Sequence, residues 1–144
     1  MKENLDPNWI GNSEEDEIYK ENILDHFKNP RNFKPLKDYD IYHKEFNPVC
    51  GDQIELFVKL NGTKVIDVGF IGKGCAISMA SASMLTEKLK DLSLNQIKNI
   101  KKEEVLEMIG IPLGIVRMKC GLLSLKTLIN GIKIVEEKNE QVSY

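Results

Sequence analysis

The sequence predicts an α+β fold, in which a small antiparallel β-sheet of about three strands packs against helices. Two alternating segments are joined at Asn61-Gly62, and this dipeptide is the strongest short signal for a β-hairpin. Segments with the apolar spacing of helices lie on both sides of the hairpin. At 144 residues, the chain has the size of one domain and can bury a core without disulfide bonds.

The helix before the hairpin is expected to follow a flexible acidic tail at residues 1–17 and to open a single domain at residues 18–140. Ile23 and Phe27 lie on one apolar stripe of this helix, and Pro30 marks its end. We expect the stripe to dock on the sheet.

Residues 53–60 alternate between apolar and polar side chains, as in a half-buried strand. The return strand covers residues 65–71, with Ile66 on its apolar face. Asn61-Gly62 between them predicts a type I′ turn, which needs positive φ at both central residues. A further short strand is expected near Ile41, within an otherwise irregular connection.

The hairpin turn determines which residues face each other at the far end of the two strands. A two-residue loop places Cys50 level with Lys73, and a four-residue loop places it level with Cys75. Either register brings the two cysteines to the same end of the hairpin. Asp52 lies on the same edge.

Four helices are predicted after the hairpin. The first begins just after Cys75, two short ones cover residues 94–97 and 103–109, and a long final helix runs from about residue 117 to 138. Cys120 falls in the first turns of that last helix. Two of the cysteines are therefore expected near helix N-termini, where the positive end of the helix dipole favours a thiolate.

The charge and hydropathy of the chain argue against two classes of partner. The 20 basic and 22 acidic residues give a net charge of -2, so no overall basic field favours nucleic acid. The start of the chain lacks the regions of a secretory signal, and no apolar run approaches the ~18 residues of a membrane span. We therefore expect a cytoplasmic protein with neither nucleic acid nor membrane as a partner.

The three cysteines are an odd number at wide spacing, which fits reduced thiols better than a disulfide framework. With Asp52 they can form an exchangeable metal site, because thiolates prefer zinc or iron and a carboxylate holds these metals more weakly. Lys119 adds a positive charge beside Cys120. The alternative is that the cysteines act as small buried apolar residues. His26 and His43 are expected to be surface or hydrogen-bonded residues.

Four motifs occur in order within residues 18–138. They are Asp25-His26-Phe27-Lys28-Asn29-Pro30-Arg31-Asn32, then Asn47-Pro48 and Cys50-Gly51-Asp52, then Gly72 and Gly74-Cys75-Ala76-Ile77-Ser78, then Arg117 and Lys119-Cys120. Together they resemble the IscU/SufU/NifU N-terminal family of iron–sulfur cluster assembly scaffolds. The resemblance implies a SufE/NifU-like α+β fold with a small antiparallel sheet covered by helices.

The resemblance also implies a function. Such a scaffold binds iron, accepts sulfur from a cysteine desulfurase of the IscS, SufS or NifS type, assembles a [2Fe–2S] cluster and transfers it to apo iron–sulfur proteins. Cys120 and Cys50 are the candidate acceptors of persulfide sulfur, with Lys119 as electrostatic support. The ligands of the family fall on Cys50, Asp52, Cys75 and Cys120.

Departures from the family pattern keep other interpretations open. Lys119 stands where the IscU branch has a histidine ligand, and a protonated lysine has no lone pair for a metal, so Asp52 is the expected fourth ligand. Lysine here is typical of the SufU branch, in which zinc occupies the same four residues of a sulfurtransferase. The interval from Cys75 to Cys120, however, lacks the insertion of that branch. A domain with a purely structural zinc is the third interpretation.

The segment Ile111-Pro112-Leu113-Gly114 also differs from the family. The IscU branch carries Leu-Pro-Pro-Val-Lys at this place, and a dedicated Hsp70-type chaperone recognises that sequence. The difference argues against chaperone-assisted release in this protein.

Overall fold

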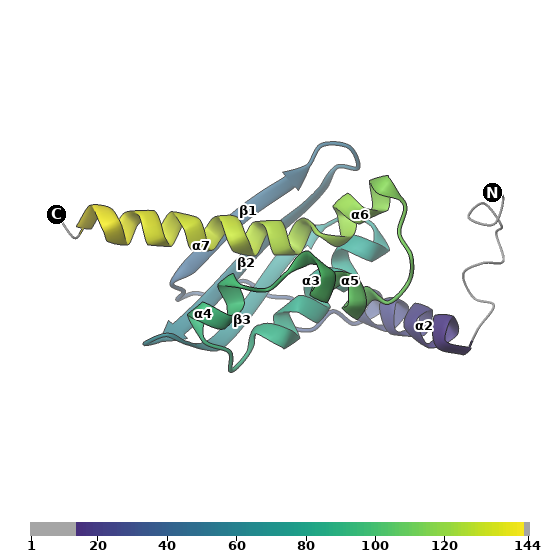
Figure 1. Ribbon diagram of the computed structural model, residues 1–144, viewed down its shortest axis with the longest axis horizontal. Coiled ribbons are helices and arrows are strands. Elements are labelled where there is room, and N and C mark those ends of the chain that lie inside the picture. Colours follow the sequence, from purple (N-terminus) through teal and green to yellow (C-terminus); the bar gives the residue numbers. More distant parts are fainter. Residues whose placement is uncertain (1–13, 143–144) are drawn as a thin grey trace.

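The computed structural model describes residues 14–142, which form a three-stranded antiparallel sheet and six helices (Figure 1). The strands lie in the order β1 (Ile41–Asn47), β2 (Asp52–Asn61) and β3 (Lys64–Lys73). The helices are α2 (Glu14–Lys28), α3 (Ala76–Leu89), α4 (Leu94–Lys98), α5 (Lys102–Ile109), α6 (Ile115–Gly121) and α7 (Leu123–Val142). The α+β prediction and the strand near Ile41 are confirmed. None of these six helices is both long enough and apolar enough to span a membrane.

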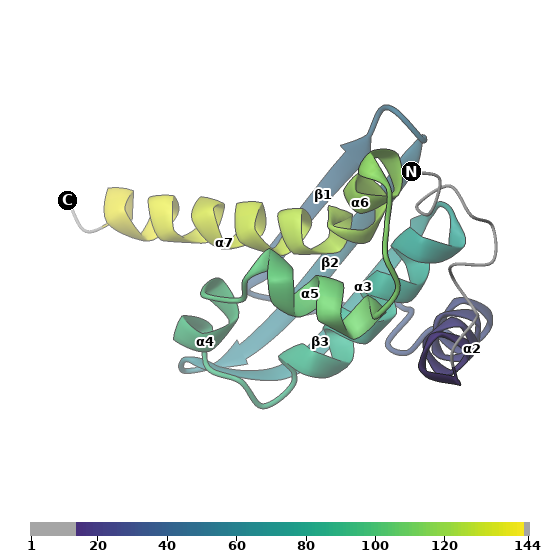
Figure 2. The same ribbon diagram turned by 45° about the vertical axis from the view of Figure 1, so that its right-hand side comes forward.

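Two helices cover one face of the sheet. The long helix α7 packs on β1 and β2, while α3 packs on β3 and against α7 (Figures 1 and 2). The apolar core lies between this face and the two helices. It includes Leu56 and Val58 from β2, Leu85 from α3 and Leu128 from α7, all of them fully buried.

Helix α2 docks on α3 instead of on the sheet, which corrects the prediction for its apolar stripe. Ile23 is buried, but Phe27 is exposed. The rotation of α2 is set by a polar contact that a hydropathy pattern does not detect, since buried His26 lies with its Nδ1 2.7 Å from Ser83 Oγ of α3. The backbone N–H of Arg31 donates to the same hydroxyl at 2.8 Å.

Helix α2 starts earlier in the chain than the sequence predicts, and His43 forms the kind of contact expected of it. Helix α2 begins at Glu14, inside the stretch assigned to the acidic tail, and residues 1–13 lie outside the described part of the chain. Acidic residues are favourable in the first turn of a helix, which explains the earlier start. His43 is hydrogen-bonded as expected, with its Nε2 2.6 Å from Glu45 Oε2.

The turn between β2 and β3 differs from the predicted type I′ turn. Asn61 and Lys64 pair with each other, so the central residues are Gly62 and Thr63. Positive φ (63°) occurs at Gly62 and not at Asn61. The Asn-Gly pair therefore locates the hairpin correctly, but glycine alone takes the left-handed conformation that the turn requires.

A β-bulge next to this turn changes the face of the return strand. Lys59 pairs with Asp67 and Leu60 pairs with Val65, so Ile66 is an extra residue on β3. Val65 is fully buried, whereas Ile66 is 51% exposed. The prediction that Ile66 faces the core is wrong, because one additional residue reverses the alternation of side chains.

The predicted final helix is divided into α6 and α7 at Leu122, which has φ -101° and ψ 1°. The side chain of Ser81 on α3 donates a hydrogen bond of 2.6 Å to the carbonyl of Gly121, at the end of α6. A backbone carbonyl that accepts a hydrogen bond from another element does not need an N–H partner in the next helical turn, so the helix can end there. Cys120 consequently lies in the last turn of α6, and the prediction that it falls in the first turns of the long final helix is wrong.

Candidate metal centre

The four candidate ligands gather at one end of the sheet, although they come from separate segments. Cys50 lies in the loop between β1 and β2, and Asp52 is the first residue of β2. Cys75 follows β3 as the N-cap of α3, and Cys120 lies near the end of α6. The expectation that Cys50 and Cys75 lie at the same end of the hairpin is thus confirmed, but Gln53 pairs with Lys73, so neither of the two expected registers is correct at this end.

A tight loop presents Cys50 to solvent. Asn47 of β1 pairs with Asp52 of β2, and the N–H of Gly51 donates to the carbonyl of Asn47 at 2.7 Å. Gly51 has a φ of 76°, a conformation that costs other residues roughly 1–2 kcal/mol. Glycine at this position therefore lets the chain reverse directly after Cys50, whose side chain remains exposed.

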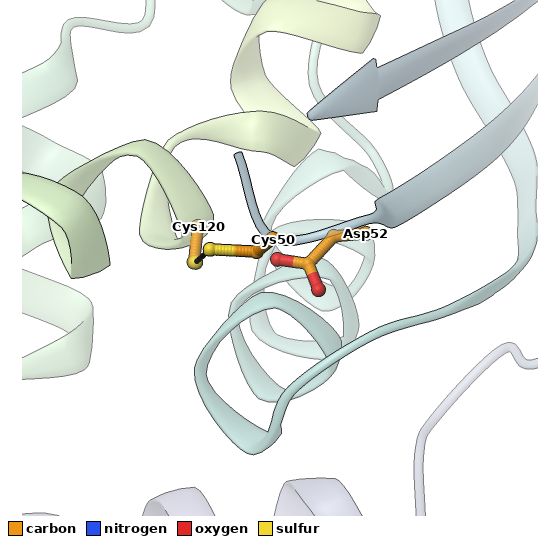
Figure 3. A group of neighbouring side chains, drawn as sticks. All are labelled: Cys50, Asp52 and Cys120. Atoms are coloured by element: carbon orange, nitrogen blue, oxygen red, sulfur yellow. Dashed lines mark hydrogen bonds between the residues drawn. The ribbon is translucent and has the colours of Figure 1, made fainter. Parts of the chain in front are cut away.

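Cys50 and Cys120 point toward each other (Figure 3). The Cys120 thiol donates to Cys50 Sγ, with the two sulfur atoms 3.4 Å apart. Asp52 completes the group, because one carboxylate oxygen and the two sulfurs lie within 4.8 Å of one another. Asp52 and Cys120 are each only 2% exposed. The group is thus anchored in the protein on one side and open to solvent at Cys50.

Cys75 is connected to this group through Asp52. Its backbone N–H donates to Asp52 Oδ1 at 3.1 Å, and its thiol lies 3.9 Å from Asp52 Oδ2. The Cys75 sulfur is also 3.7 Å from Ser78 Oγ, and that hydroxyl donates to the Cys75 carbonyl at 3.1 Å. Sequence reasoning assigned no role to Ser78. Its position three residues after a helix N-cap was the available signal, because such a residue faces back to the cap.

Gly74 allows the close approach of these elements. A Cβ added at this position would lie 2.5 Å from Ser78 Oγ and 2.6 Å from Asp52 Oδ1. Both distances are shorter than a carbon–oxygen contact permits, so any larger residue would displace Asp52 or α3. The glycine before Cys75 is therefore required by the packing of the site.

Burial raises the pKa of the Cys120 thiol, and the neighbouring Asp52, Cys50 and Cys75 side chains raise it further. The Cys120 sulfur lies 3.9 Å from Asn47 Nδ2 and 3.7 Å from the carbonyl of Val116. Because Cys120 is at the end of α6, the positive end of the α6 dipole does not lower this pKa. In the metal-free protein, Cys120 is a neutral thiol at neutral pH.

A cavity of about 410 Å³ opens beside the three thiols. Two of its lining residues are basic, Lys20 and Arg117, and none of its lining residues within the described range 14–142 is acidic. Its remaining lining is apolar apart from the cysteines. An anion that leaves or reaches the thiols through this cavity would meet positive charge.

Lys119 lies in a different groove of about 520 Å³, which it lines together with Phe46, Val49 and Met118. No thiol lines this groove. The Lys119 side chain is exposed and makes no hydrogen bond or ion pair with another residue of the part of the chain that the structure describes. The structure therefore does not bring Lys119 into contact with the thiols that it was expected to support.

The sequence of the chain matches a protein family and several named proteins. A family model described as NifU-like N terminal domain matches residues 18–142. The zinc-dependent sulfurtransferase SufU of Bacillus subtilis is 37% identical over 145 residues, which cover 89% of this chain and 98% of that protein. The iron–sulfur cluster assembly scaffold protein IscU 1 of Archaeoglobus fulgidus is 32% identical over 125 residues, which cover 87% of this chain and 81% of the relative.

The fold is also found in a crystal structure. The N-terminal part of a nitrogen-fixing NifU-like protein from Brucella abortus superimposes with a TM-score of 0.69 at 21% identity, and the match covers 85% of this chain and 97% of the other. At this identity the superposition concerns the fold alone. The Brucella protein therefore shares the overall fold of this chain.

Proposed function

The chain belongs to the NifU-like N-terminal domain family, and from this premise we propose that it is an iron–sulfur cluster assembly scaffold. A single observation carries the proposal. The ligand atoms of Cys50, Asp52 and Cys120 converge within 4.8 Å at one end of the sheet, and Cys75 is joined to them through Asp52. The relatives that are named as scaffolds support the same conclusion.

The cluster is the cargo of such a protein, and the donor set suits a cargo. Three cysteine sulfurs favour iron in clusters, and one carboxylate is a weaker and more exchangeable ligand. We propose that a [2Fe–2S] cluster is built on these four residues and transferred to apo iron–sulfur proteins. Cys50 and Cys75 are exposed, so an acceptor protein can reach the cluster from solvent, while buried Asp52 and Cys120 hold its inner side.

Sulfur acceptance is assigned to Cys50 in this proposal. Its thiolate attacks the outer sulfur of a persulfide on a cysteine desulfurase, so that the sulfur atom passes to Cys50 and the desulfurase cysteine leaves as a thiolate. Exposure supports Cys50 over Cys120 as the acceptor, because Cys50 lies at the tip of a loop and Cys120 is 2% exposed. A protein-bound persulfide can approach the first residue but not the second.

A zinc-dependent sulfurtransferase is the second candidate function. The specific observation in its favour is the Bacillus relative of that name, which is matched over 98% of its length. Zinc takes four ligands in a tetrahedron, and the same three cysteines and Asp52 can provide them. Cys50 would then leave the metal to accept sulfur, which its exposed position permits.

One experiment separates the two functions. The protein is purified without oxygen and analysed for iron, zinc and sulfide, and it then receives a cysteine desulfurase, cysteine and ferrous iron. A coloured cluster that can be transferred to apo-ferredoxin is the expected result for a scaffold. Tightly held zinc and stimulated desulfurase turnover, without any cluster, would instead establish the sulfurtransferase.

A further inference from the structure

We propose that Cys120 is the resolving thiol of this site, which attacks a persulfide on Cys50 and releases its outer sulfur as sulfide. The inference rests on the proposed acceptance of sulfur by Cys50. A persulfide carries sulfur at the oxidation level of elemental sulfur, whereas an iron–sulfur cluster contains sulfide. Each sulfur atom therefore needs two electrons before it can enter a cluster, and the arrangement of the two thiols supplies them.

The geometry favours this reaction because the two sulfur atoms are already in contact. Cys120 Sγ lies 3.4 Å from Cys50 Sγ, within the distance of about 3–3.5 Å that is typical of reacting atoms held ready for attack. Once Cys50 carries an additional sulfur, its own Sγ becomes the inner sulfur of the persulfide. Cys120 thus faces the inner sulfur, and attack there expels the outer one.

The reaction balances without any external oxidant. The Cys120 thiol and the Cys50 persulfide anion form a Cys50–Cys120 disulfide and a hydrosulfide ion. The bond between the inner and outer sulfurs breaks, a bond between the two Sγ atoms forms, and the thiol proton of Cys120 leaves with the hydrosulfide. The pair of thiols is oxidised to a disulfide by two electrons, and the sulfane sulfur is reduced to sulfide by the same two electrons.

The cavity beside the thiols is suited to the product. Lys20 and Arg117 line it together with the three cysteines, and no acidic residue of the part of the chain that the structure describes does so. Hydrosulfide is an anion, so these two positive charges favour its release into the cavity. There it remains next to Cys75, another proposed ligand of the cluster.

The burial of Cys120 makes the reaction selective. Because Cys120 is 2% exposed, a large persulfide donor cannot load it directly, and its accessible partner is the sulfur that Cys50 carries. Each cycle leaves a disulfide between two proposed ligands. A thiol reductant must open this disulfide before the next sulfur is accepted, so release of sulfide and renewal of the site are separate steps.

The test uses the full chain, freed of metal by a chelator, reduced, and desalted without oxygen. Inorganic polysulfide serves as the sulfur donor, so that no desulfurase is needed. Sulfide release is followed over time, and samples blocked with an alkylating reagent are mapped by mass spectrometry without reduction. Loading of Cys50 expels a shorter polysulfide or hydrosulfide from the donor, and the wild-type protein is expected to release one further sulfide for each Cys50–Cys120 disulfide formed. C120S should keep the persulfide on Cys50 and release sulfide more slowly by roughly tenfold or more.

The stoichiometry in the wild-type protein tests the inference even if C120S folds poorly. Equal sulfide release from wild-type protein and C120S, with Cys50 loaded in both, would overturn the resolving role and leave the scaffold function intact. Persulfide found on Cys120 of the wild-type protein without a disulfide would overturn it as well. If Cys50 takes up no sulfur in either protein, the inference fails together with the proposed acceptance of sulfur.

Discussion

The carboxylate of Asp52 accepts a hydrogen bond of 3.1 Å from the backbone N–H of Cys75. A proposed ligand at the start of β2 thus also holds the first turn of α3, on which a second proposed ligand lies. Changes at Asp52 therefore act in two ways. They alter the donor set, and they alter the position of Cys75.

The substitution Asp52→Ala separates these two effects when it is compared with Asp52→Asn. Loss of the exchangeable carboxylate is expected to keep a bound cluster for longer in both variants, as measured by the rate of transfer to apo-ferredoxin. The alanine variant also leaves the Cys75 N–H without its acceptor, which should lower the free energy of unfolding by about 1–2 kcal/mol. The asparagine variant keeps an oxygen acceptor and should remain closer to wild type. Faster loss of the cluster in both variants would show that Asp52 is not the element that permits release.

The substitution Gly74→Ala tests the close packing at the site, with Gly114→Ala as the matched control. The first would place a Cβ 2.5 Å from Ser78 Oγ, whereas a Cβ at Gly114 has no heavy atom within 4 Å. Both glycines precede a helix that carries a proposed ligand. We expect Gly74→Ala to lower the free energy of unfolding in urea by about 1–3 kcal/mol, and Gly114→Ala to change it by less than about 0.5 kcal/mol. Similar values for the two variants would contradict the steric argument.

The burial of His26 in the folded protein predicts how the stability of the protein depends on pH. Burial lowers the pKa of His26 in the folded protein, so the unfolded chain binds a proton at this residue more readily. The contribution of neutral His26 to stability is complete above the unfolded pKa of about 6.5 and is lost as the pH falls from there through the lower folded pKa. Urea midpoints of wild type and His26→Gln at several pH values between 5 and 8 measure this. The wild-type midpoint should fall more steeply below pH 6.5, and parallel curves would refute the prediction.

The three cysteines are expected to react with iodoacetamide at different rates in the metal-free protein. Cys50 and Cys75 are exposed, whereas Cys120 is buried and burial raises the pKa of its thiol. The thiolate is the reactive form, so Cys120 should be the slowest by roughly tenfold or more at pH 8. Peptide mapping after short reaction times gives the three rates, and unfolding in urea is the control that should make them similar. Rapid labelling of Cys120 in the folded protein would contradict its assignment as a thiol reached only through Cys50.

Local patterns were sufficient to predict the sheet and the gathering of three proposed ligands. The alternation along β2 and the Asn61-Gly62 pair locate the hairpin, and its ends then bring Cys50 and Cys75 together whichever loop length is chosen. The predicted proximity of the two cysteines holds despite the bulge that was not predicted. An error of one residue in the strand register moves neither cysteine to the other end of the strands.

The remaining differences arise from contacts between side chains that are far apart in the sequence. Two serines of α3 account for two of them, since Ser83 turns α2 through His26 and Ser81 holds the carbonyl of Gly121, where α6 ends. Both serines are fully buried, and the sequence pattern identifies them only as small residues on one face of a helix. A sequence pattern shows where a helix can form, but not which hydrogen bond will rotate or interrupt it.

The four proposed ligands are not all held by the same part of the fold, because one of them lies on helix α6. Three of the proposed ligands lie at or next to the ends of strands: Cys50, Asp52 and Cys75. Cys120 instead belongs to the seven-residue helix α6, which lies between its N-cap Gly114 and the break at Leu122. The first residue of that helix, Ile115, is 83% exposed. The sheet can thus position three of the four proposed ligands, while the fourth is positioned by one short helix that is not part of the sheet. A displacement of α6 by an incoming protein would open the site at Cys120 without unpairing a single strand.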